Sequence, residues 1–120
     1  MKIKEVIETA KSLRQGCSLS EKNAVRWLRT LDEIIKLEIH DTSEGTEQVI
    51  DFDSYDGETV LIVPEPYCEL YISYLCAQID KSVGELNRYN NEMNIFENAY
   101  RKYSAFYNRT HMPKGQNFKW

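Results

Sequence analysis

Lysine and arginine are missing from a long central part of this 120-residue chain. Neither occurs between Lys36 and Lys81, an interval that holds eleven of the 19 acidic residues. The other eight acids and all 15 lysines and arginines lie outside it, so the rest of the chain has a net charge of +7 although the total is −4. We expect the acidic run to be a solvated loop, or a segment that avoids a polyanion or binds a basic partner. The candidates for this acidic loop are Asp51, Asp53, Asp56 and Glu58.

Histidine and cysteine are scarce, which argues against a metal site. The two histidines, His40 and His111, are far apart in the sequence and belong to no H-x-x-H pair. Cys68 and Cys76 lie eight residues apart on a predicted helix, a rise of ~12 Å that a disulfide cannot span. Together with Cys17 they make an odd number, and we expect all three to be reduced, buried thiols.

Glycine is also sparse, and the five glycines form no phosphate-binding loop or nucleophile motif. The segment DFDSYDGE at 51–58 fails as a calcium loop because Asp56 stands where a glycine is needed. A Cys76–His111 pair remains open from the sequence, although a cysteine on an apolar helix is more typical of a core. We therefore expect no catalytic, metal-binding or cofactor-binding residues and no enzymatic activity.

Long apolar runs are absent as well. No stretch approaches the ~20 apolar residues of a membrane span, and the first residues lack the apolar core of a signal peptide, so we expect synthesis in the cytoplasm. With 42% apolar and 28% charged residues, the chain has the composition of a folded domain. Residues 1–110 should form a single helical domain. Residues 111–120 have no helical periodicity and are expected to be a flexible C-terminal tail.

Apolar residues recur at helical spacing in the N-terminal third of the chain and predict two helices. The first covers residues 2–14. The second covers residues 20–40 and begins after Ser18 or Ser20, either of which is a suitable N-cap.

Residues 41–65 break this helical period. The segments 48–52 and 59–63 have the β-branched and aromatic content of short strands. The connection is therefore expected to be a long acidic loop or a short β-hairpin. Because an isolated hairpin is marginal in water, we expect another subunit or a partner to cover its edge.

A third apolar stripe runs from Pro66, a suitable first helical residue, to Tyr107. An unbroken helix of that length would exceed the width of a small domain, so the helix either breaks near Gly84 or within 87–91 or projects beyond the monomer, and we favour a break. Asn90 and Asn91 are then the caps of a fourth helix. The predicted fold class is mainly α, a small helical bundle of three to four helices with a long acidic loop or short β-hairpin between helices two and three.

Tyrosine and phenylalanine are concentrated in this last stripe. Aromatic residues at helical spacing usually pack in a core. Their number here exceeds what two amphipathic helices would cover, and tyrosine suits a surface that is half dry and half wet. We expect the surplus to form a subunit or partner interface. The interface candidates are Tyr100, Tyr103 and Tyr107 in the stripe, with Phe118 and Trp120 in the tail.

Several strings of the sequence resemble one group of small proteins. Residues 63–113, with PEPY at 64–67, YNN at 89–91 and YNRTHMP at 107–113, resemble small proteins of prophages and tailed phages of Gram-positive bacteria. AVRWLRTLDEIIKLEI at 24–39 is similar to their earlier helix. The resemblance implies a head–tail connector or adaptor, a helical subunit of the virion that assembles into a ring below the portal and leaves a channel for DNA.

The resemblance also implies the partners, none of which is a membrane. They are copies of the chain itself, the portal protein and tail-side completion proteins, with DNA only as non-specific cargo in the channel. An acidic loop in such a channel would let DNA slide, because DNA binding is driven by lysine and arginine at phosphates. The alternative is a non-enzymatic regulatory or scaffold module of a prophage that binds a protein partner as a monomer or dimer.

Overall fold

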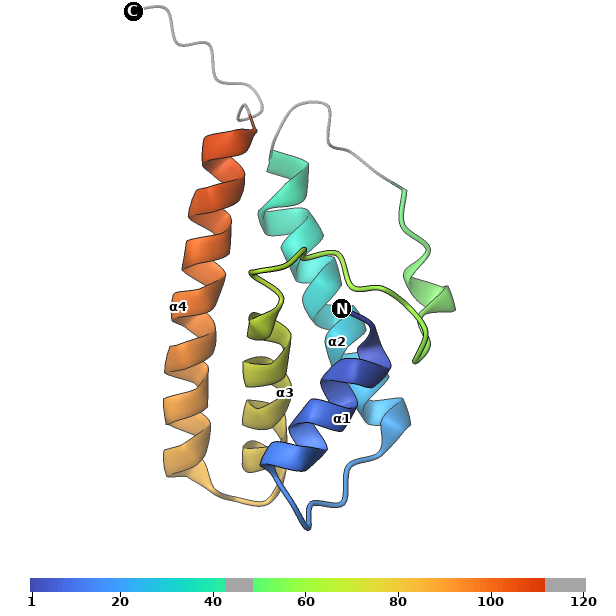
Figure 1. Cartoon of the computed structure of the whole chain (residues 1–120), viewed down its shortest axis with the longest axis vertical. Helices are drawn as coiled ribbons and strands as arrows, with labels where there is room; N and C mark the ends of the chain where they lie inside the picture. Colours follow the sequence, from blue (N-terminus) through green and yellow to red (C-terminus); the bar gives the residue numbers. More distant parts are fainter. Residues whose placement is uncertain (43–48, 112–120) are drawn as a thin grey trace, which may run out of the picture.

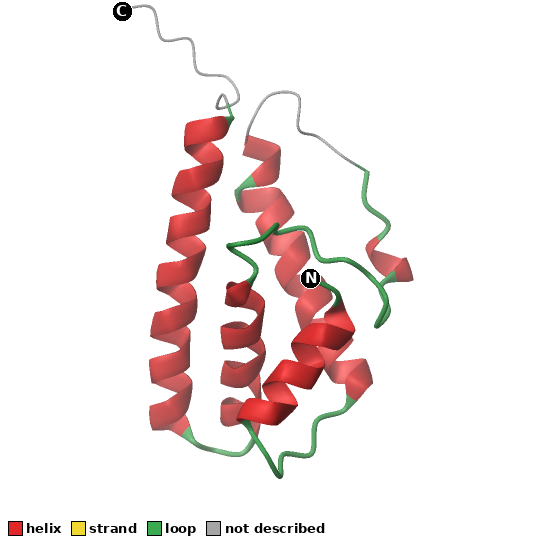
Figure 2. Cartoon of the chain, in the orientation of Figure 1, coloured by secondary structure: helices red, strands yellow, loops and turns green. Residues whose placement is uncertain are grey.

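Helices make up most of the computed structural model, which describes residues 1–42 and 49–111 (Figure 1). The helices are α1 (Ile3–Leu13), α2 (Glu21–Glu38), α3 (Glu69–Ser82) and α4 (Leu86–Thr110), with the short 3-10 helices η1 (His40–Thr42) and η2 (Phe52–Ser54). Figure 2 shows loops and helices but no strand within the described ranges. The predicted fold class, a mainly α bundle, is confirmed.

The helix starts and ends follow local signals in the sequence. Ser20 is the N-cap of α2, and its hydroxyl accepts a hydrogen bond from the Asn23 N–H at 3.4 Å. The break predicted near Gly84 is present, and Gly84 has φ +79°, a conformation that glycine adopts without strain. The predicted caps Asn90 and Asn91 are wrong, because α4 already begins at Leu86 and contains both residues.

The start of α3 also differs from the prediction. Pro66 is not its first residue, since residues 65–68 form a turn and the helix begins at Glu69. Within this turn the Tyr67 N–H donates to the Pro64 carbonyl at 3.0 Å. The turn brings the Tyr67 ring against α4, where it stacks on Phe106 with centroids 4.8 Å apart.

The predicted β-hairpin is not formed by the described residues. Residues 49–51 lie in no strand and residues 52–54 form η2, whereas Val60 makes an isolated antiparallel bridge with Lys2. The bonds beside this bridge run from the Ile3 N–H to the Thr59 carbonyl at 3.0 Å and from the Leu61 N–H to the Met1 carbonyl at 3.0 Å. The N-terminal residues of the same chain therefore pair with the 59–61 backbone, whereas the sequence predicts another subunit or a partner there.

A buried carboxylate on α2 joins the loop to the helices. Asp32 has no exposed surface, and its oxygens accept hydrogen bonds from the Tyr55 hydroxyl at 2.7 Å, the Ile62 N–H at 3.2 Å and the Tyr71 hydroxyl at 2.6 Å. The Tyr71 hydroxyl in turn accepts from the Val63 N–H at 2.9 Å. Every donor in this network therefore has an acceptor. The network holds α2, α3 and residues 55–63 in fixed positions relative to one another.

A second polar cluster holds the other end of the bundle. Asp80 on α3 is fully buried. Its carboxylate accepts hydrogen bonds from Nε and from a terminal nitrogen of Arg14, at 2.8 and 3.0 Å. The same guanidinium also donates to Glu92 of α4 at 2.8 Å. Arg14 follows α1, so this arginine ties α1 to both α3 and α4.

The Asp32 network makes stability depend on pH. Desolvation raises the pKa of Asp32 from 3.8 to about 6, and the hydrogen bonds to the carboxylate offset only part of this effect. The native state therefore binds this proton more tightly than the unfolded chain. This tighter proton binding stabilises the native state fully below about pH 4, and the stabilisation is lost as the pH rises to about 6. Across this range the free energy of unfolding should fall by up to about 3 kcal/mol.

Urea denaturation of the wild type and of Asp32→Asn between pH 4 and 7 measures this contribution. The free energy of unfolding of the wild type should decrease with pH relative to that of the variant, which lacks the titrating group. Asp53→Ala, at an exposed position, is the matched control and should keep the pH dependence of the wild type. Parallel curves for wild type and Asp32→Asn would contradict this assignment.

Candidate protein-interaction site

Two of the three candidate tyrosines of α4 lie in the core. Tyr103 is 1% exposed and Tyr107 is 6% exposed, so the prediction that these side chains face outward is wrong. The Tyr103 hydroxyl lies 2.6 Å from His40 Nε2, and its ring packs against Tyr67 with centroids 5.7 Å apart. The stripe is buried because α4 packs on the end of α2 and on the turn before α3 as well as on α3 itself.

The end of this stripe is a stack of aromatic rings. Tyr107 lies between His40 and His111, with ring centroids 4.6 and 3.8 Å apart and nearly parallel planes. Burial is the main effect that lowers the pKa of His40, so this ring is held in its neutral form. The stack fixes the upper end of α4 in Figure 1 against the end of α2.

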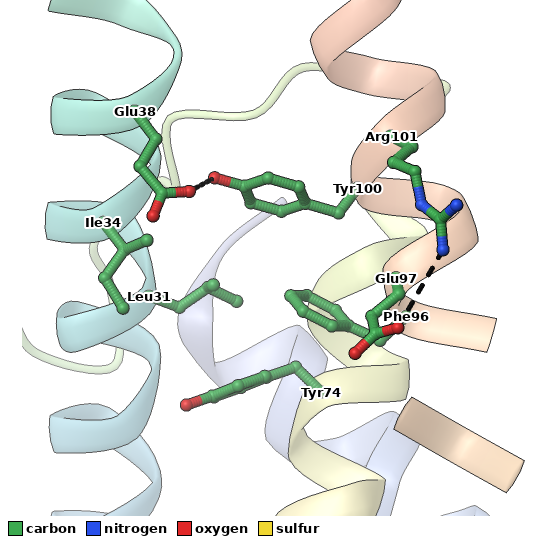
Figure 3. Close-up of a pocket in the computed structure, with 8 residues that line it drawn as sticks. All are labelled: Leu31, Ile34, Glu38, Tyr74, Phe96, Glu97, Tyr100 and Arg101. Carbon is green, nitrogen blue, oxygen red and sulfur yellow. Dashed lines mark hydrogen bonds and ion pairs between the residues drawn. The ribbon is translucent and has the colours of Figure 1, made fainter. Parts of the chain in front are cut away.

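Tyr100 is the candidate that remains partly exposed, and it lines a groove between α2 and α4. Its hydroxyl donates to Glu38 on α2 at 2.5 Å across the top of this groove (Figure 3). Phe96 and Tyr74 lie deeper, with ring centroids 5.1 Å apart. We call this the α2–α4 groove; its volume is about 290 Å³, and it is lined by Leu31, Ile34, Glu38, Tyr74, Phe96, Glu97, Tyr100 and Arg101.

The chemistry of the α2–α4 groove suits an aromatic or aliphatic side chain. Leu31 and Phe96 are buried, whereas Ile34 is 38% exposed and forms an open apolar wall. The rim carries Glu38 and Glu97, and Glu97 is 3.9 Å from Arg101 in a surface ion pair. The groove is therefore apolar inside and carries a net negative rim.

The acidic loop is only partly an open acidic surface. Asp51, Asp53 and Asp56 are exposed, and none of them belongs to an ion pair between described residues. Asp51 and Asp56 accept hydrogen bonds from nearby backbone N–H groups at 3.2 and 2.9 Å. Glu58 differs, because Lys2 and Lys4 lie within 3.2 and 2.8 Å of it and lower its pKa. The other tail candidates, Phe118 and Trp120, lie outside the described residues.

Two exposed apolar surfaces were missed in the sequence. The first, called the loop surface, joins α2 to residues 49–52, and its apolar side chains are those of Leu37, Val49, Ile50 and Phe52. The second, called the turn surface, lies at the α3–α4 turn and the end of α1, where the exposed side chains of Leu13 and Val83 lie among polar residues that include Arg14 and Arg88. Leu37 is 69% exposed and Val83 is 57% exposed. The signal available for Leu37 was its place off the apolar stripe of α2.

The described residues offer little for catalysis or metal binding. Cys68 and Cys76 are buried and Cys17 is half-buried, and burial raises the pKa of Cys76 to about 11. Cys76 lies near Arg14, whereas His111 follows the far end of α4, so the two are not brought together (Figure 1). Within residues 1–42 and 49–111, no three histidine, cysteine or acidic side chains converge on a possible metal site. No helix in the same ranges is long and apolar enough to cross a membrane.

Comparisons with models of protein families, with curated protein sequences and with solved structures gave no match. The resemblance of residues 24–39 and 63–113 to small phage proteins therefore stays a prediction. The function has to be inferred from the surfaces of the molecule.

The burial of Tyr103 gives a stability prediction that separates a core role from an interface role. Tyr103→Ala removes a buried ring and its bond to His40, and should lower the free energy of unfolding by about 3–5 kcal/mol. Tyr100→Ala should cost less than half as much because this ring is partly exposed. Urea denaturation of the monomer measures both, with Tyr100→Phe as the control that removes only the hydroxyl. Equal, small losses would place Tyr103 outside the core.

Proposed function

We propose that this chain is a structural subunit of a phage virion, a head–tail connector or adaptor. It assembles with copies of itself into a ring below the portal protein and leaves a channel for DNA. The resemblance of residues 24–39 and 63–113 suggests this class. The observation that carries the proposal is that two different surfaces of one subunit each present exposed apolar side chains, Leu37 and Val49 on the loop surface and Leu13 and Val83 on the turn surface.

The position of these two surfaces favours a ring. The loop surface lies on the side of the molecule that carries η2, and the turn surface lies at its lower end, where α3 joins α4 (Figure 1). A contact that joins two different patches is heterologous, and its repetition about a rotation axis closes a ring. Single apolar residues are common on surfaces, but clusters that include side chains such as Leu37 and Val83 typify interaction sites. The loop surface of one copy therefore packs on the turn surface of the next.

The acidic loop supports the role of the channel. Asp51, Asp53 and Asp56 are exposed, and none of the three forms an ion pair with a lysine of the described residues. A ring that turns these carboxylates toward its axis repels phosphates and so lets DNA pass without binding. Glu58 contributes less, because Lys2 and Lys4 compensate its charge.

The proposed role is not enzymatic. A reactive cysteine needs an accessible thiolate, whereas burial raises the pKa of both Cys68 and Cys76. The buried Asp32 is a better candidate for an acid or base, but its oxygens are occupied by Tyr55, Tyr71 and the Ile62 N–H. These groups hold the fold together and point to no substrate.

Aspartate substitutions in the two surfaces test the ring. Leu37→Asp and Val83→Asp should each abolish association of the purified chain, alone or with portal protein of the same phage, because a charge is placed in an apolar contact. A mixture of the two variants should form a discrete dimer and no ring, since each copy keeps one intact surface. Light scattering and native mass spectrometry measure the assembly.

The control for this test is Ile95→Asp, which changes an exposed residue of α4 outside both surfaces and should assemble like the wild type. A dimer that only Leu37→Asp or only Val83→Asp disrupts, with no rescue in the mixture, would indicate a twofold contact. That outcome favours the regulatory or scaffold module. A wild-type chain that stays monomeric in the presence of portal protein would contradict the connector assignment.

Thiol alkylation tests the non-enzymatic role. In the folded chain near neutral pH, N-ethylmaleimide should modify half-buried Cys17 before the buried Cys68 and Cys76. All three should react at once in urea. Mass spectrometry of the native and denatured protein over time gives the order. Rapid modification of Cys76 in the native state would instead indicate an activated thiol and reopen an enzymatic role.

A further inference from the structure

The α2–α4 groove is an open apolar site that the proposed ring does not use. Its open wall is Ile34, its floor is Phe96, and neither residue belongs to the loop surface or the turn surface. Three aromatic rings, those of Tyr74, Phe96 and Tyr100, surround the space at tilted angles of 50° and 52° to one another. A further aromatic ring can pack edge-to-face against such a set.

The rim of the groove selects for positive charge. Glu38 on α2 and Glu97 on α4 both line the groove, Glu38 beside the Tyr100 hydroxyl and Glu97 beside Arg101 (Figure 3). Arg101 compensates one of these two charges at 3.9 Å and is itself exposed at the edge of the groove. An occupant with a large ring and an adjacent lysine therefore matches both the interior and the rim.

One segment of the chain has this chemistry. Residues 112–120 contain Phe118, Lys119 and Trp120 in succession, together with Lys114, and no acidic residue. They follow His111, whose ring stacks on Tyr107 at 3.8 Å on the side of α4 that faces α2. His111, after which this segment begins, therefore lies at the end of the seam between α2 and α4.

The length of this segment is sufficient to reach the groove in the same subunit. Tyr100 lies eleven residues before His111 on α4, a distance along the helix axis of ~16 Å. Phe118 lies seven residues after His111, and an extended chain of that length spans ~23 Å. Binding within one chain also avoids the entropy of bringing two molecules together, and short tethers give effective concentrations in the millimolar range.

We propose that the α2–α4 groove binds the Phe118-Lys119-Trp120 segment of its own chain, with an aromatic ring in the apolar interior and Lys119 beside Glu97. The contact covers Ile34 and Phe96 in the free subunit. It is independent of the ring contacts, which involve other residues. A partner that presents a similar basic aromatic segment competes for the same groove.

Fluorescence of a single tryptophan tests this contact in the full chain. Trp27→Phe leaves Trp120 as the only tryptophan and changes no residue of the groove. The emission of Trp120 should be shifted to the blue, and acrylamide should quench it less than it quenches a peptide of residues 112–120. Adding Ile34→Asp should raise quenching to the level of the peptide, whereas adding Ile95→Asp should leave it unchanged. Circular dichroism checks that each variant is folded.

Charge reversal tests the same contact without touching the core. Glu97→Lys and Lys119→Glu should each weaken docking by about two- to fivefold, as for an exposed ion pair, and the double variant should recover it. Peptide-like quenching of Trp120 in the Trp27→Phe chain would overturn the proposal. Quenching that decreases with protein concentration would also overturn it, because the groove would then hold the segment of another copy. Loss of ring assembly in Leu37→Asp with normal Trp120 protection separates this result from the proposed function.

Discussion

The carboxylate of Asp32 is the constraint on which the rest of the molecule depends. It is buried in the middle of α2, and its three donors come from the loop and from α3. Removing such a group from water is unfavourable unless hydrogen-bond donors replace the lost water. The fold satisfies this requirement only when Tyr55, Ile62 and Tyr71 meet at one point. The position of the loop, and hence of the loop surface beside Leu37, follows from that meeting.

Helix α4 is held at its two ends by different chemistry. Near its start Glu92 shares the Arg14 guanidinium with Asp80, while near its end Tyr107 stacks between two histidines. Between these two attachments α4 stands away from α2 far enough to leave the α2–α4 groove. The groove and the two exposed apolar surfaces are thus consequences of where the polar and aromatic contacts were placed. The groove and the two surfaces involve different residues.

Local sequence signals predicted the helices well. They could not predict contacts between residues that are far apart in the sequence. The cap at Ser20 and the break at Gly84 depend only on nearby residues, and both are present in the structure. The burial of Tyr103 was missed because it depends on the turn at 65–68 and the end of α2, which approach only in the folded chain. Likewise, nothing near Asp32 in the sequence shows that an acid on an apolar helix face accepts three hydrogen bonds.

The unequal lengths of α3 and α4 determine where this bundle can bend. Helix α4 has 25 residues and α3 has 14, so the difference in axial length is ~16 Å. Helix α3 consequently does not extend beside the last turns of α4. These turns instead contact the rings of Tyr67 and His40. A tilt of α4 at this end would change the ring contacts of Tyr103 and Tyr107 within the core, whereas the ion pairs of Arg14 lie at the opposite end of the helix.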